Sequence, residues 1–173
     1  MTEEQKKVRK FYKDFLSWKA EAIGTWIGAG VMVMFLLIAC AVPAQEVLMA
    51  LEEETDYITW MILILFGPLA GLLYLRPYTN VTEIVYTNQP TNARIIDKLK
   101  YLPIDFKEIR KMKVIYLFKF FAKILPFGMG LQMLTCLASY GEITWLNVGY
   151  GVLVAFIWPV VTNLPMVLLE KTA

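Results

Sequence analysis

Long runs of residues without a charge alternate with short polar segments along the chain, and this pattern predicts a membrane protein. The uncharged runs are residues 22–45, 57–75, 124–141 and 143–169. A helix needs about 20 predominantly apolar residues to cross the hydrocarbon core of a bilayer. We extend the third run back to Val114, with Lys119 and Lys123 reaching toward the lipid headgroups. The predicted spans are 22–42, 57–75, 114–139 and 144–169.

A shorter amphipathic segment, residues 1–20, precedes the first predicted span. Its large apolar side chains recur at helical spacing on one side, at Val8, Phe11, Tyr12, Phe15 and Trp18. Its lysines lie largely on the other side, at Lys6, Lys7, Lys10 and Lys13. This pattern is typical of a helix that lies along the membrane surface. A solvated basic segment is the alternative.

The amino-acid composition is also typical of a membrane protein. Hydrophobic residues make up 58% of the chain and the mean hydropathy is +0.53, which is too apolar for an ordinary soluble domain. We therefore expect an all-α polytopic protein whose 173 residues form a single membrane domain. Cys40 and Cys136 fall inside apolar runs, so we interpret them as small buried side chains without a disulfide.

The distribution of charge predicts the orientation. Residues 91–123 contain nine of the chain's 17 Lys and Arg residues, whereas the segment 42–56 contains acidic residues and no basic one. Since basic loops stay on the cytoplasmic side of a membrane, we expect both termini and the loop 76–113 in the cytoplasm. The expected location is a cell membrane, the bacterial inner or plasma membrane. The net charge of +2 gives no reason to expect nucleic-acid binding.

The loop 76–113 has the features of a docking element. Pro103 disfavours a helical conformation at Leu102, and Asp105 can cap a new helix that carries Glu108 in its first turn. We predict a short basic helix over residues 93–101, a break, and a second helix that continues into the third span. The candidate docking residues are Arg94, Lys98, Lys100, Leu102, Pro103, Asp105, Lys107, Glu108 and Arg110. An acidic groove of a soluble protein and anionic lipid headgroups would both suit this loop.

Small residues occur at the spacing that lets helices approach closely in lipid. Gly24 and Gly28 in the first span, with Gly30 beyond them, match this spacing, as do Gly67 and Gly71 in the second. The contacts lie either within the chain or with another membrane subunit or a second copy. The outer segment 42–56 is either a short acidic helix or a solvated loop.

Four polar side chains inside the spans are candidates for a pathway: Gln132, Thr135, Thr162 and Asn163. The last two lie beside Pro159 and Pro165, which remove backbone hydrogen bonds and kink a helix. They therefore either replace the lost hydrogen bonds or line a route through the membrane. One continuous wet cavity around these four residues would favour transport, and contact with protein or lipid would favour a scaffold.

Several kinds of chemistry have no residues to support them. No Asp, Glu or Arg lies in the middle of a predicted span, as proton-coupled transporters require. The chain contains no His, which excludes His-based catalysis and His-ligated metals. A phosphate-binding loop sequence is also missing. We expect neither an enzyme nor a cofactor or metal.

Residues 102–109, Leu-Pro-Ile-Asp-Phe-Lys-Glu-Ile, are followed by Lys111 and Lys113 and then by an apolar helix. This segment resembles the cytoplasmic region of type-2 exporter permeases of ATP-binding-cassette transporters, between their second and third spans. In that family a comparable run lies close to a coupling helix that docks onto the ATPase. The amphipathic segment 1–20 is similar to the family's elbow helix.

The resemblance implies a non-catalytic membrane subunit that couples a cytoplasmic ATPase subunit of the ATP-binding-cassette type to export or extraction of a substrate. Such permeases usually have six spans, whereas four are predicted here, so it implies a reduced permease that needs partners. The alternative is an accessory or scaffolding subunit of a larger membrane complex, without a transport path of its own.

Overall fold

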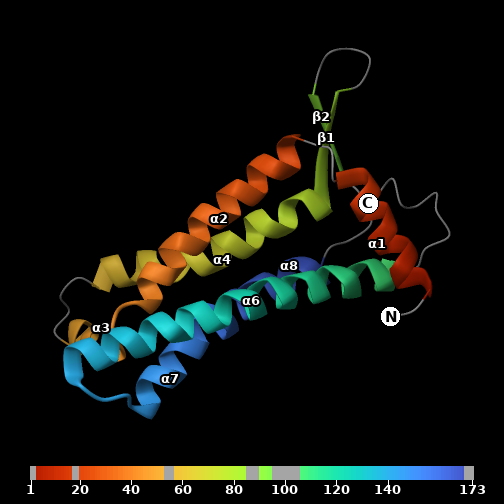
Figure 1. Cartoon of the computed structure of the whole chain (residues 1–173). Helices are drawn as coiled ribbons and strands as arrows, with labels where there is room; N and C mark the ends of the chain where they lie inside the picture. Colours follow the sequence, from red (N-terminus) through yellow and green to blue (C-terminus); the bar gives the residue numbers. More distant parts are fainter. Residues whose placement is uncertain (1–2, 17–19, 53–56, 85–89, 95–105, 170–173) are drawn as a thin grey trace.

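The computed structural model describes residues 3–16, 20–52, 57–84, 90–94 and 106–169. These residues fold mainly into helices, with one β hairpin among them (Figure 1). The elements are α1 Glu3–Leu16, α2 Ala20–Cys40, α3 Ala44–Glu52, α4 Tyr57–Thr79, β1 Asn80–Ile84, β2 Pro90–Arg94, α6 Phe106–Tyr140, α7 Trp145–Val152, the π-helical turn η1 Leu153–Ile157 and α8 Trp158–Leu168. The predicted helical class is confirmed.

Three helical segments in the described part of the chain are long and apolar enough to cross a membrane. They are Ile23–Cys40, Lys107–Tyr140 and Trp145–Leu168, and they correspond to the first, third and fourth predicted spans. They support a membrane protein. The second predicted span, 57–75, lies within α4, a helix of 23 residues. That α4 also crosses the membrane remains a prediction.

The long helices run side by side, and each runs opposite to the preceding one (Figure 1). α2 packs along α4, and α6 packs along the continuous helix formed by α7, η1 and α8. α1 lies across the end of the bundle where α6 begins (Figure 1). The core draws buried side chains from all four long helices, including Leu36, Ala70, Phe121 and Val160. Cys40 and Cys136 are buried free thiols, as predicted.

The last long helix accommodates a proline by widening one turn. The η1 turn ends at Ile157, two residues before Pro159, and the Trp158 N–H donates to the carbonyl oxygen of Leu153, five residues earlier. Proline has no N–H to continue the α-helical pattern, and π-helical turns absorb such interruptions. The interruption expected at Pro159 therefore takes the form of a π-helical turn.

The β hairpin lies within the loop 76–113, and its strands pair in antiparallel register from Asn80 with Arg94 to Ile84 with Pro90. The helix predicted over residues 93–101 is therefore wrong at its start, because Ala93 and Arg94 belong to β2. The remainder of that prediction, 95–101, lies outside the described residues. The β-branched residues of β1 favour a strand and explain the difference.

α6 is longer than a membrane crossing requires. Its 35 residues extend about 52 Å, compared with about 30 Å for the hydrocarbon core. It begins at Phe106, directly after the predicted capping residue Asp105, and ends at a turn in which Gly141 has a φ of +72°. The Gly141 N–H donates to the Leu137 carbonyl, a helix termination that favours glycine. The excess length lies at the charged, N-terminal end of α6.

Candidate functional site

The two ends of the bundle differ in charge. α1, the last turn of α4 and the first turns of α6 lie at one end, and α3 lies at the other (Figure 1). The first end, here the basic end, carries Lys6, Lys7, Arg9, Lys10, Arg76, Lys107, Arg110, Lys111 and Lys113. The second, here the acidic end, carries Glu46, Glu52 and Glu142 and, in the described residues, no Lys or Arg. The segregation seen in the sequence thus maps onto opposite ends of one bundle.

At the basic end α1 is attached to α6 through Glu108. The Gln5 amide donates to one carboxylate oxygen of Glu108 at 2.8 Å, and Lys111 pairs with the other. The hydrogen bonds from Lys111 and then Gln5 lower the pKa of Glu108, which lies on the charged part of α6 before the apolar segment 124–141. Val8 adds a buried apolar contact from α1. The interfacial helix is therefore held against the start of the third predicted span.

The structure describes only part of the predicted docking set. Lys98, Lys100, Leu102, Pro103 and Asp105 lie outside the described residues, and Arg94 lies on β2. Lys107 is exposed, and Glu108 and Arg110 are half-buried, all on the first turns of α6. Gln5 was not predicted as a partner of Glu108. The two residues are 103 positions apart, and no sequence signal links them.

The four candidate pathway residues all make contacts inside the protein. Asn163 is buried, and its amide nitrogen donates to the carbonyl oxygens of Pro68 on α4 (3.0 Å) and Pro159 (2.8 Å). The hydroxyls of Thr135 and Thr162 donate to backbone carbonyls one turn earlier in their own helices. Gln132 is 1% exposed and faces the turn between α2 and α3.

A polar cluster lies against that turn, formed by the buried side chains of Gln132 and Asn147 and the half-buried Thr144. The Asn147 side chain is fully buried, accepts from the Ala44 N–H at 3.1 Å and donates to the Thr144 hydroxyl at 2.9 Å. With its amide nitrogen toward α2, Gln132 donates to the carbonyl oxygens of Val42, at 2.9 Å, and Cys40. The cluster satisfies backbone groups at the end of α2 and the start of α3.

The small-residue motif of α4 makes its close contact within the chain. A Cβ added to Gly67 would lie 2.7 Å from Cγ of Pro159, and one added to Gly71 would lie 2.9 Å from Cγ of Asn163. In the motif of α2, a Cβ added to Gly28 would lie 3.5 Å from Cδ1 of Leu73 on α4, whereas Gly24 and Gly30 have nothing within 4 Å of an added Cβ. Of the two alternatives left open by the sequence, packing within the chain therefore holds for α4.

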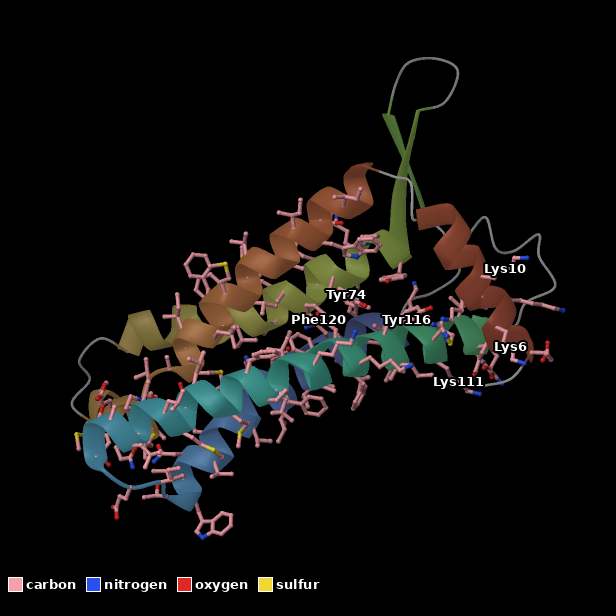
Figure 2. The ribbon with its side chains drawn as sticks, viewed as in Figure 1. Lys6, Lys10, Tyr74, Lys111, Tyr116 and Phe120 are labelled. Atoms are coloured by element: carbon pink, nitrogen blue, oxygen red, sulfur yellow. The ribbon has the colours of Figure 1, made fainter. Side chains whose placement is uncertain are left out.

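A band of aromatic rings lies between α4 and α6 close to the basic end, where Figure 2 shows Tyr74, Tyr116 and Phe120. Tyr74 stacks on Phe120 with ring centroids 4.1 Å apart, and Tyr78 stacks on Tyr116 at 5.0 Å. Beside the rings lies a cavity of about 490 Å³, here the basic pocket. Its lining is Gln5, Arg9, Tyr74, Met112, Ile115, Tyr116, Lys119, Phe120 and Lys123. None of the four candidate pathway residues lines it.

No known protein family, curated protein or solved structure matches this chain. The likeness of residues 102–109 to exporter permeases therefore remains a prediction from the sequence. Within the described residues, no group of three or more acidic, Cys or His side chains is placed to hold a metal ion.

Proposed function

We propose that this chain is a non-catalytic accessory subunit of a larger membrane complex, which holds a cytoplasmic partner at its basic end and has no transport path through its own bundle. One observation supports the absence of a transport path through the bundle. Gln132 and Asn163 are buried, and their hydrogen bonds join one helix to another. The hydroxyls of Thr135 and Thr162 donate to backbone carbonyls of their own helices. Polar side chains used in this way favour a scaffold.

The outer surface of the bundle supports a subunit embedded in lipid or in other membrane proteins. Large apolar side chains are exposed along α2, at Ile27 and Met34, and along α6, at Phe127 and Leu134. Many exposed large apolar side chains on long helices are typical of contact with a membrane or with other proteins. Trp145, 89% exposed at the acidic end, is suited to the opposite membrane–water interface.

The basic end supports the docking part of the proposal. The hydrogen bond between Gln5 and Glu108 fixes α1 to α6, so cations of the two helices keep one arrangement. A preorganised set of positive charges attracts an acidic protein surface and sets its orientation. By the positive-inside rule, this end faces the cytoplasm.

A second proposal, suggested by the sequence, is the membrane subunit of an ATP-binding-cassette exporter. Two observations favour it: α1 precedes the first span as an elbow helix would, and α6 begins at Phe106, within the run that resembles the permease segment. Under this proposal the partner at the basic end is an ATPase, and the path for the substrate lies between this chain and another membrane subunit.

Affinity purification of the tagged full chain from its native membrane, with quantitative mass spectrometry of the co-eluting proteins, tests both proposals. The variant Lys98→Gln, Lys100→Gln, Lys107→Gln removes three charges from the predicted docking loop. The yield of one soluble partner should fall about tenfold, since each exposed ion pair contributes about 0.5 kcal/mol to such an interaction.

The matched control is Glu46→Gln, Glu52→Gln, Glu142→Gln, which neutralises three charges at the acidic end and should leave the partner in place. A partner that is an ATP-binding-cassette ATPase would favour the exporter, and any other partner would favour the accessory subunit. Equal retention of every co-eluting protein by both variants would contradict docking at the loop.

A further inference from the structure

We propose that the basic pocket between α1, α4 and α6 binds the phosphate group of an anionic phospholipid. Three cations from two helices line this cavity of about 490 Å³: Arg9 from α1, and Lys119 and Lys123 from α6. The two lysines are four residues apart and lie on the same face of α6. Arg9 approaches from the interfacial helix, so positive charge lines the cavity from two elements.

In the described part of the chain, no carboxylate forms an ion pair with the three cations of the pocket. By contrast, Lys6 and Lys111 have Glu3 and Glu108 as partners. Like charges around one cavity repel each other, and a bound anion converts the repulsion into attraction. Arginine binds a phosphate group through two parallel hydrogen bonds, and lysine binds it as a point charge.

The depth of the pocket in the membrane indicates that the anion is a lipid headgroup. Lys123 directly precedes the uncharged segment 124–141, which extends about 27 Å as a helix and nearly matches the hydrocarbon core of about 30 Å. Lys119 and Lys123 therefore lie at the level of the lipid headgroups. The rings of Tyr74 and Tyr116 lie beside them, as expected for the aromatic belt of a membrane protein.

The remainder of the lining favours a lipid over free phosphate. Met112, Ile115 and Phe120 give the pocket an apolar wall next to its cations. A free phosphate ion gains nothing from apolar contact, whereas the glycerol backbone and the upper acyl chain of a phospholipid would bury apolar surface there. The chemistry of the pocket thus matches the whole headgroup region of an anionic lipid.

Native mass spectrometry of the full chain in detergent tests the assignment, with phosphatidylglycerol and phosphatidylcholine of identical acyl chains as probes. We expect the first phosphatidylglycerol molecule to bind about tenfold more tightly than phosphatidylcholine. The variant Arg9→Gln, Lys119→Gln, Lys123→Gln should weaken phosphatidylglycerol binding about a hundredfold, at roughly fivefold for each charge.

The matched control, Lys6→Gln, Lys7→Gln, Lys10→Gln, removes three charges from α1 outside the pocket and should change the affinity less than about threefold. If the triple variant does not fold, the single variant Lys123→Gln tests the proposal, with an expected loss of about fivefold in affinity for phosphatidylglycerol. Equal affinity of the unaltered chain for both lipids would overturn the proposal. Displacement of the lipid by excess inorganic phosphate would overturn it in favour of a site for free phosphate.

Discussion

Gly67→Ala is expected to destabilise the helix bundle by about 1–3 kcal/mol, the usual cost of placing an extra group in a packed interface. The new Cβ would lie 2.7 Å from Cγ of Pro159, and the rigid proline ring cannot turn aside. α4 and α8 must therefore separate, which also strains the hydrogen bond from Asn163 to the Pro68 carbonyl. Unfolding in mixed micelles of mild and denaturing detergent, followed by circular dichroism, measures the change.

Gly30→Ala is the matched control. Gly30 also lies inside a long helix, but a Cβ there has nothing within 4 Å. Because alanine favours the helix over glycine by about 1 kcal/mol, this variant should be as stable as the unaltered chain or slightly more so. Equal losses of stability at Gly67 and Gly30 would contradict the close packing of α4 against α8.

Asn147→Leu should destabilise the chain by about 2–4 kcal/mol. Leucine has the same number and branching of heavy atoms as asparagine, but it removes the acceptor for the Ala44 N–H and the donor to Thr144. Each buried polar group left without a partner costs about 1–3 kcal/mol, and hydrogen bonds between helices in membranes contribute about 0.6–2 kcal/mol. The turn that joins α2 to α3 should loosen first, since Asn147 holds the start of α3.

The same unfolding assay, together with hydrogen exchange of the α2–α3 turn, measures this effect. Thr135→Val is the control, because the Thr135 hydroxyl bonds only to carbonyls of its own helix. Its expected cost is below about 1 kcal/mol. A loss at Asn147 no larger than at Thr135 would show that the cluster does not stabilise the turn.

The helices could be predicted from the sequence because apolar length decides where a chain enters lipid. Three of the four predicted spans coincide with helices long and apolar enough to cross a membrane. The β hairpin was missed because the loop was interpreted from its charges and prolines. Its first strand, Asn-Val-Thr-Glu-Ile, carries the β-branched residues that signal a strand.

The polar contacts could be predicted only in part. Gln132 and Asn163 stand out as polar residues inside apolar runs, but the sequence does not say which backbone groups they meet. Asn147 carries the same signal and was overlooked. The contact of Gln5 with Glu108 depends on how α1 lies across the bundle, and tertiary packing alone decides this. The predicted docking residues from Lys98 to Asp105 remain predictions.

The whole account depends on the orientation of the bundle, with its basic end in the cytoplasm and its acidic end outside. Labelling of single introduced cysteines tests this orientation most directly. Cys40 and Cys136 are buried, so the unaltered chain serves as the blank. A membrane-impermeant maleimide should label Glu46→Cys and Glu142→Cys in intact cells. It should label Lys10→Cys and Lys107→Cys only after the membrane is permeabilised. Labelling of Lys10→Cys or Lys107→Cys in intact cells would contradict a cytoplasmic basic end, and with it the proposed docking surface.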